Sequence, residues 1–172
     1  PEEEIKEALI LSSRSLVEIE PNYTFATARI LLDSLRTEAL SFLKVKDNAT
    51  FAEMKSLYGT SLKAFVDKAV SLELLNPELQ KMDLDFLGNQ IKPERDLLFS
   101  YLGLQTLYDR YFIHSNEIRF ELPQVFFMRV AMGLAIAEDN REERAVEFYN
   151  LLSSFDYMSS TPTLFNLSLI HI

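Results

Sequence analysis

The sequence lacks cysteine, which excludes disulfide frameworks, thiolate metal sites and thiol nucleophiles within its 172 residues. It has only four glycines and none of the patterns GxGxxG, GxxxxGKS/T or GxSxG, so no phosphate-cradling loop or nucleophile elbow is predicted. Neither of its two histidines, His114 and His171, has an acidic residue three positions before it, which excludes the Glu-x-x-His pairs of di-iron bundles. We therefore expect no catalytic residue, cofactor site or metal site here, and a structural or exposed position for His114.

Basic residues are also scarce. The chain carries 17 Lys and Arg against 26 Asp and Glu, a formal net charge of −9. Phosphate backbones and anionic lipid surfaces require a surplus of positive charge at the contact. We therefore expect neither nucleic acid nor a membrane surface as a partner.

Long apolar runs are absent as well. The longest extends from Val125 to Ala137 and is interrupted by Arg129, whereas a membrane span needs roughly 20 residues, so it predicts a buried helix of a soluble protein. The chain opens with Pro1 and three glutamates, the opposite of the basic start of a secretion signal. We expect the chain to begin inside a longer protein and to be cytoplasmic.

What is present favours one folded, mainly helical domain, because 48% of the residues are hydrophobic and 12% are aromatic. Apolar residues recur at spacings of three and four, which predicts helices. The predicted helices cover residues 2–20, 22–43, 62–72, 78–82, 84–87, 94–112, 123–137 and 142–156. Alternating residues 118–122, after a turn at 115–117, predict the only strand before the chain's end.

Several residues carry local expectations. Asn22, Asn76 and Asp139 or Asn140 are candidate helix caps, and Gly59 is a candidate stop signal. Arg129 lies in an apolar helix, so we expect its guanidinium to reach water or a structural carboxylate partner. The neighbouring stripe of Phe126, Phe127, Met128 and Met132 is more typical of core packing than of a cofactor pocket. The acidic residues 139, 142 and 143 fit a helix start better than a catalytic carboxylate cluster.

Several separated motifs, in order along the chain, closely resemble the large subunit of class I ribonucleotide reductase. They are Pro21-Asn22-Tyr23, Asp96 to Tyr101, Tyr108-Asp109-Arg110-Tyr111, Glu121 to Ala135, Phe148-Tyr149 and Ser160 to Asn166. The resemblance implies a mainly α helical bundle followed by the start of an α/β barrel. By it, residues 1–20 are the last helix of an ATP-cone, 21–157 the helical domain and 158–166 the entry to the barrel. Residues 167–172 depart from the family's pattern and are expected to be a foreign tail.

The family reduces ribonucleoside diphosphates to 2′-deoxyribonucleoside diphosphates by thiyl radical chemistry. The resemblance places its catalytic cysteines beyond Asn166, so this fragment alone is expected to be inactive. One substrate-binding residue maps here, Thr161 of the Thr-Pro-Thr run, which would hydrogen-bond the nucleotide. A basic residue that contacts the effector in some members falls at Thr37, so that contact is lost.

The resemblance also implies partners and cofactors. They are the small subunit with its metal and radical cofactor, a second large subunit, ATP or dATP and deoxynucleotide effectors, a ribonucleoside diphosphate, and thioredoxin or glutaredoxin as reductant. None of these cofactors is expected to be bound by the fragment alone. Composition by itself equally supports an alternative, a non-enzymatic helical interaction module.

Overall fold

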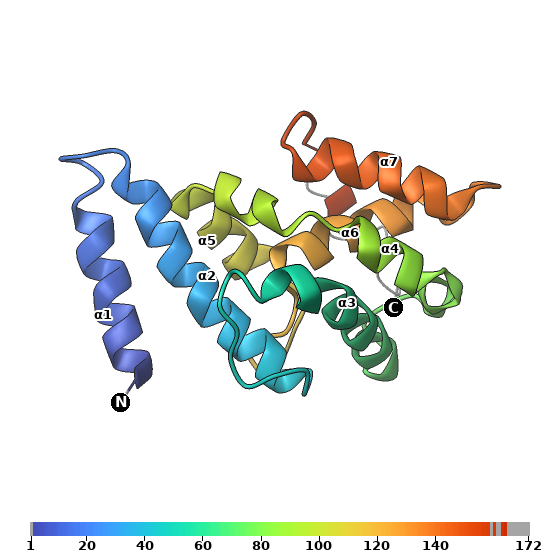
Figure 1. Cartoon of the computed structure of the whole chain (residues 1–172), viewed down its shortest axis with the longest axis horizontal. Coiled ribbons are helices and arrows are strands. Elements are labelled where there is room, and N and C mark those ends of the chain that lie inside the picture. The colour runs from blue at the N-terminus through green and yellow to red at the C-terminus, as the bar shows by residue number, and fades with distance from the viewer. Residues whose placement is uncertain (1, 159, 161–162, 165–172) are drawn as a thin grey trace.

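The computed structural model describes residues 2–158, 160 and 163–164, and in them the chain is mainly helical with one short hairpin (Figure 1). This confirms the predicted fold class. The α-helices are α1 (Glu2–Ser15), α2 (Tyr23–Phe42), α3 (Met54–Ser71), α4 (Leu84–Gln90), α5 (Tyr101–Arg110), α6 (Pro123–Ala135) and α7 (Arg141–Ser153). The 3₁₀-helices are η1 (Pro77–Lys81) and η2 (Pro93–Leu98), and the strands are β1 (His114–Ser115) and β2 (Ile118–Arg119).

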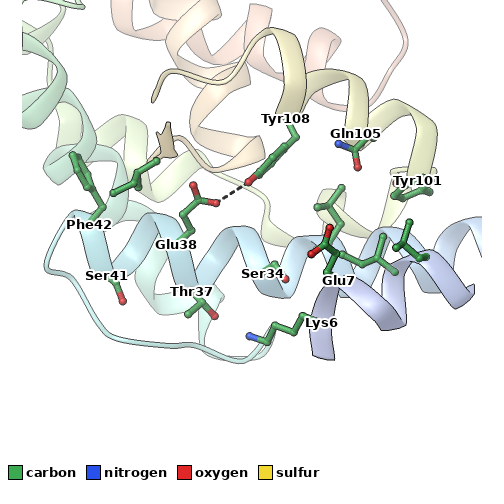
Figure 2. A pocket seen from close by; sticks show the side chains of 14 residues that line it. Lys6, Glu7, Ser34, Thr37, Glu38, Ser41, Phe42, Tyr101, Gln105 and Tyr108 are labelled. Atoms are coloured by element: carbon green, nitrogen blue, oxygen red, sulfur yellow. Dashed lines mark hydrogen bonds between the residues drawn. The ribbon is translucent and has the colours of Figure 1, made fainter. Parts of the chain in front are cut away.

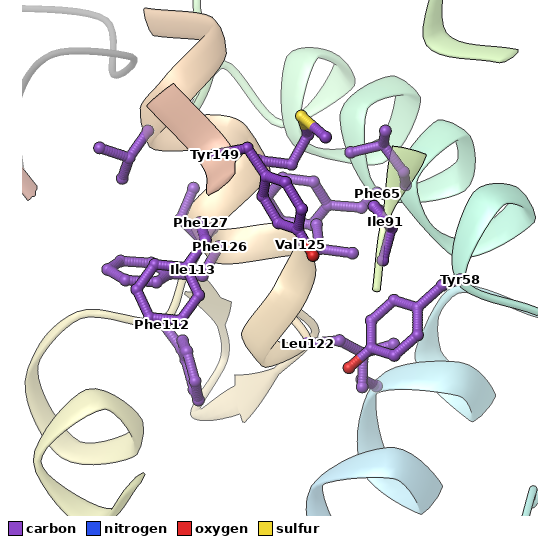
Figure 3. Packing of buried hydrophobic residues seen from close by; sticks show 14 of the residues in the cluster. Tyr58, Phe65, Ile91, Phe112, Ile113, Leu122, Val125, Phe126, Phe127 and Tyr149 are labelled. Carbon is purple, nitrogen blue, oxygen red and sulfur yellow. The ribbon is translucent and has the colours of Figure 1, made fainter. Parts of the chain in front are cut away.

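Helix α6 forms the centre of the core. Every residue from Pro123 to Gly133 is buried, because the helix is apolar on nearly all sides and packs against α7 and α3. Figure 3 shows Phe126 and Phe127 among the buried aromatic side chains, and the rings of Phe112 and Phe126 meet edge to face at 5.6 Å. The predicted core role of the aromatic and methionine stripe is confirmed.

Helix α1 lies at one end of the molecule and packs against α2 (Figure 1). It ends at Ser15, so the prediction of a helix to Glu20 was wrong. Its apolar residues are largely open to solvent, since Ile5 is 62% exposed and Leu9 51% exposed. The contact with α2 is partly polar, including a Ser13–Thr27 hydroxyl hydrogen bond of 2.6 Å.

Helix α3 begins at Met54, earlier than its apolar pattern indicates, and it contains Gly59. The prediction of a stop at Gly59 was therefore wrong. Helix α4 crosses α3 at this point, with Gly88 directly opposite Gly59. A Cβ atom at Gly88 would lie 2.8 Å from the Gly59 Cα, closer than non-bonded atoms approach. These glycines permit a close helix crossing.

The predicted long helix over residues 94–112 is divided into η2 and α5, so this prediction was wrong. Phe99 and Ser100 adopt extended backbone between the two helices. The buried Phe99 ring stacks with that of Phe127, and the Ser100 hydroxyl accepts a hydrogen bond from the Gly103 amide at 3.2 Å, capping α5. Local capping and one buried ring thus override the continuous apolar pattern.

Turns and caps agree only partly with the predictions. Asn76 caps η1 as predicted, whereas Asn22 and Asn140 make no side-chain cap at the helices they precede. The predicted turn is confirmed, with Asn116 and Glu117 both at positive φ, joining two antiparallel strands. The prediction of a single strand over residues 118–122 was wrong in two respects, because β1 pairs with it and because β2 ends at Arg119, before the chain leads into α6.

Candidate functional site

The predicted substrate residue, Thr161, lies outside the described residues. Beside it, the Ser160 carbonyl accepts hydrogen bonds from the Thr163 and Leu164 amides at 3.1 and 3.2 Å, so the backbone is helical at 163–164, whereas the barrel entry implied by the resemblance would begin with a strand. The Leu164 side chain is buried against the helical body. The buried Leu164 side chain therefore holds the chain against the helical body directly after the Thr-Pro-Thr run.

A groove of about 830 Å³ runs along α2, flanked by α1 on one side and by α5 and the hairpin on the other (Figure 2). At its inner wall, Glu38 accepts hydrogen bonds from the Tyr108 hydroxyl at 3.0 Å and from the Arg119 amide at 2.6 Å. Burial, together with the neighbouring Glu38 charge, raises the pKa of Tyr108 to about 12, so its hydroxyl stays protonated as a donor. These hydrogen bonds join α2, α5 and β2 at this wall of the groove.

Thr37 lies in the same groove, where its hydroxyl donates to the Asp33 carbonyl at 3.0 Å and contacts the Asn48 side-chain oxygen at 3.3 Å. Because threonine carries no positive charge, the family resemblance implies that the contact between a basic residue here and the effector is lost. Lys6 of α1 also lines this groove, with its ammonium 3.3 Å from the Asp33 carboxylate. No sequence pattern indicates this, because only the packing of α1 against α2 brings Lys6 beside Thr37.

A buried chain of hydrogen bonds joins η2, α3, α6 and α7. The Lys92 amide donates to the Tyr149 hydroxyl, which donates to the Gln124 side-chain oxygen, both at 2.9 Å. The Gln124 amide group donates to one oxygen of Asp96 at 2.9 Å, and the Tyr58 hydroxyl donates to the other at 2.6 Å. Every donor points toward Asp96, which is the terminal acceptor.

Burial raises the pKa of Asp96 to about 6, against the hydrogen bonds from Tyr58 and Gln124, which favour the charged form. A raised carboxyl pKa is a common feature of active sites. Here, however, the carboxyl is only 1% exposed and both oxygens are already hydrogen-bonded. The arrangement supports a structural role rather than a catalytic one.

Arg129 and Glu121 form a buried ion pair, with Arg129 Nε 2.5 Å from Glu121 Oε1. The second carboxylate oxygen also accepts from the Ile113 amide at 2.9 Å. Burial raises the pKa of Glu121, whereas the Arg129 charge opposes that rise. The expectation that Arg129 reaches a structural carboxylate partner is confirmed.

His114 is exposed on β1, as expected. Within the described ranges, no group of three or more His, Cys, Asp or Glu side chains is placed to hold a metal ion. In the same part of the chain, no helix has the length and apolarity required to traverse a bilayer.

Comparison with known proteins gives the same family throughout. Residues 97–169 match the family described as ribonucleotide reductase, all-alpha domain. The chain is 44% identical over 171 residues to ribonucleoside-diphosphate reductase subunit alpha of Chlamydia muridarum, which covers 99% of this chain and 16% of that relative. It is 39% identical over 166 residues to subunit alpha of Helicobacter pylori, covering 95% of this chain and 19% of that relative.

A more distant match, 29% identical over 148 residues, is to the ribonucleoside-diphosphate reductase large subunit of Variola virus, covering 85% of this chain and 18% of that relative. The helical fold and these matches define a ribonucleotide reductase all-alpha domain. The chain belongs to the large-subunit family of that enzyme, and it spans less than a fifth of the length of these relatives. The family match runs to residue 169, so the domain boundaries and the foreign tail from residue 167 stay predictions.

Proposed function

We propose that this chain is the helical domain of a class I ribonucleoside-diphosphate reductase large subunit, which converts ribonucleoside diphosphates to 2′-deoxyribonucleoside diphosphates for DNA synthesis. Similarity to reductase alpha subunits over 99% of the chain supports this proposal most strongly. The chain has no cysteine, so the thiyl radical and the reducing cysteine pair would be supplied by the rest of the longer protein.

Within that enzyme the helical domain would act as a rigid support. Its buried polar chain and ion pair fix α6 and α7 against their neighbours, and α7 leads directly to the Thr-Pro-Thr run. Thr161 would then hydrogen-bond the bound nucleotide. Catalytic groups work best on elements that are held in place by packing, which is the contribution proposed for this domain.

The proposal includes the family's partners and setting. The enzyme would act in the cytoplasm, with a small subunit that carries the metal and radical cofactor and with a second large subunit. ATP or dATP and deoxynucleotides would act as allosteric effectors, and thioredoxin or glutaredoxin would be the reductant. This chain alone would bind none of them fully and would show no turnover.

The test uses the longer protein expressed from the native gene together with its small subunit. CDP should be reduced to dCDP, and Thr161→Ala should lower kcat/KM roughly tenfold by removing one hydroxyl contact, whereas Thr161→Ser should retain most activity. Thr163→Ala is the matched control. An intact, correctly assembled protein that gives no dCDP would contradict the proposal and favour the non-enzymatic interaction module.

A further inference from the structure

A second groove, about 700 Å³ in volume, lies where the described chain ends. Its walls include Phe25 of α2, Leu102 of α5, Phe155 and Met158 beyond α7, and Leu164. No Asp, Glu, Lys or Arg lines it, although the whole chain carries a net charge of −9. We call this surface the apolar groove.

Several large side chains of the apolar groove are open to solvent, above a floor that includes the buried Phe99 and Leu107. Leu102 is 74% exposed, Met158 52% and Phe25 41%. Single exposed apolar residues are ordinary, but several that converge on one uncharged hollow are typical of a surface that another protein surface covers. An uncharged lining also matches the centre of a permanent interface better than that of a transient one.

The path of the chain indicates what covers it. Leu164, the last described residue, is only 4% exposed and forms part of the groove's wall. The relatives at 39% and 44% identity are more than five times as long as their matched portion. A domain attached to the same polypeptide has a high effective concentration at a surface beside its point of attachment.

Phe155 forms part of one wall of the apolar groove. It has a positive φ of 63°, which turns the chain sharply after α7, and its ring packs edge to face on Phe99 and Phe127 at 5.1 and 5.8 Å. Positive φ just after a helix is an ordinary way to end it, and here the Tyr157 amide donates to the Leu151 carbonyl at 3.2 Å, so it is the two ring contacts that fix the Phe155 side chain. The wall that carries Phe155 and Met158 is therefore anchored to the α6 core.

We propose that the apolar groove is the docking surface for the domain that follows this chain in the longer protein, and that Leu102 and Met158 are its central contacts. This inference rests on the proposed function only in treating the chain as one part of a longer subunit. The occupant should present an apolar, uncharged surface. Docking there would set the position of the Thr-Pro-Thr run relative to the helical domain.

Hydrogen exchange of α5 amides tests this directly, with the 172-residue chain and the longer protein measured side by side. In the longer protein, α5 exchange should slow at least tenfold, and Leu102→Asp should remove that protection. In the 172-residue chain, Leu102→Asp should change neither circular dichroism nor α5 exchange, because the side chain is already exposed. Leu151→Asp, which replaces a half-exposed leucine of α7 outside the groove, is the matched control and should leave α5 protection unchanged.

Met158→Gln provides a second, milder variant should Leu102→Asp prevent the longer protein from folding, and it should also reduce α5 protection. Equal α5 exchange in the two proteins would overturn the proposal. So would α5 protection that appears only on adding the small subunit, or that rises with the concentration of the 172-residue chain, since these assign the groove to another partner or to a second copy. A longer protein that protects α5 but does not reduce CDP would overturn the proposed function alone.

Discussion

The two buried carboxylates, Asp96 and Glu121, differ in what compensates their charge. Glu121 faces the Arg129 guanidinium and a backbone amide, whereas both Asp96 oxygens accept from neutral groups, an amide and a phenol, with the Arg36 charge adding only a smaller effect in favour of the ionised form. Removing one partner of a buried ion pair leaves the other charge uncompensated, which lowers stability. A buried carboxylate that neutral groups hold has a raised pKa, so its contribution to stability depends on pH. The two sites therefore call for different tests.

For the ion pair, Arg129→Met should lower the free energy of unfolding by about 3–5 kcal/mol, because it leaves the Glu121 charge buried without its counterion. Adding Glu121→Leu to that variant should restore part of the loss. Urea unfolding of the single and double variants measures both effects. Arg144→Met, which breaks an exposed pair with Glu147, is the control and should change stability by less than about 1 kcal/mol. Equal effects at the buried and exposed pairs would contradict this prediction.

For Asp96, the pKa in the folded protein is about 6, against about 3.9 expected for an unfolded chain. The folded state thus holds the proton more tightly, so the stability contributed by Asp96 is fully present below pH 4 and is lost as pH rises through 6. Relative to Asp96→Asn, the parent chain should lose roughly 2–3 kcal/mol between pH 4 and 7.

Urea unfolding at several pH values measures this difference. Asp139→Asn, at an exposed position, should give a curve parallel to that of the parent chain. If the Asp96→Asn curve is also parallel, the shifted pKa is wrong.

Sequence patterns predicted some of these residues and not others. A lone arginine in an apolar helix indicates a carboxylate partner, but Glu121 is identified only when the extended segment before α6 brings it beside Arg129. No pattern indicates the Asp96 chain, because its members come from four elements that are distant in sequence. Thr161 came from family resemblance alone, and its role stays a prediction.

At the scale of elements, periodicity located most helices but misplaced their ends. The pattern over residues 94–112 is apolar throughout, so it carries no signal that Phe99 turns inward and Ser100 caps a new helix. Gly59 was predicted to end a helix because glycine commonly does so. Its actual role, a close approach to Gly88, arises only when α3 and α4 cross. Contacts between elements determine both the break at residues 99–100 and the role of Gly59, and the local sequence pattern gives no sign of them.

The glycine crossing gives opposite predictions for two similar substitutions. Gly88→Ala places a Cβ atom against the α3 backbone at 2.8 Å and should cost about 1–3 kcal/mol of stability. Gly59→Ala places its Cβ no closer than 3.6 Å to the backbone of Gly88 on α4 and should gain about 0.5–1 kcal/mol, as expected for Gly to Ala within a helix. Thermal unfolding of the two variants measures the difference. Equal destabilisation by both would contradict the asymmetry of this crossing.

For the whole molecule, α1 is the least integrated helix. Much of its apolar surface is exposed, and α2 is its main neighbour. Removing residues 1–20 should therefore lower the free energy of unfolding by no more than about 3 kcal/mol, the contribution of three partly buried apolar side chains, Ile10, Leu16 and Val17, and a few polar contacts. Hydrogen exchange should be faster in α1 than in α6.

The control truncation ends the chain after residue 140, which removes α7 with its buried Tyr149 and Leu152, and it should abolish cooperative folding. Cooperative loss of structure on removing only residues 1–20 would contradict the division predicted at residue 20. The fold class of the whole molecule was predictable, since helical periodicity and family resemblance agree. The arrangement of its surfaces was not, because grooves form only between packed elements.

The one-way order of donors toward Asp96 has a consequence for the register of α6. That helix is apolar on nearly every side, so hydrophobic packing alone would tolerate several axial positions. A slide of one turn, about 5.4 Å, would put Met128 where Gln124 stands and leave a buried carboxylate without its amide donor. The hydrogen-bond chain that ends at Asp96 thus selects a single axial position of α6 from among those that hydrophobic packing alone would allow.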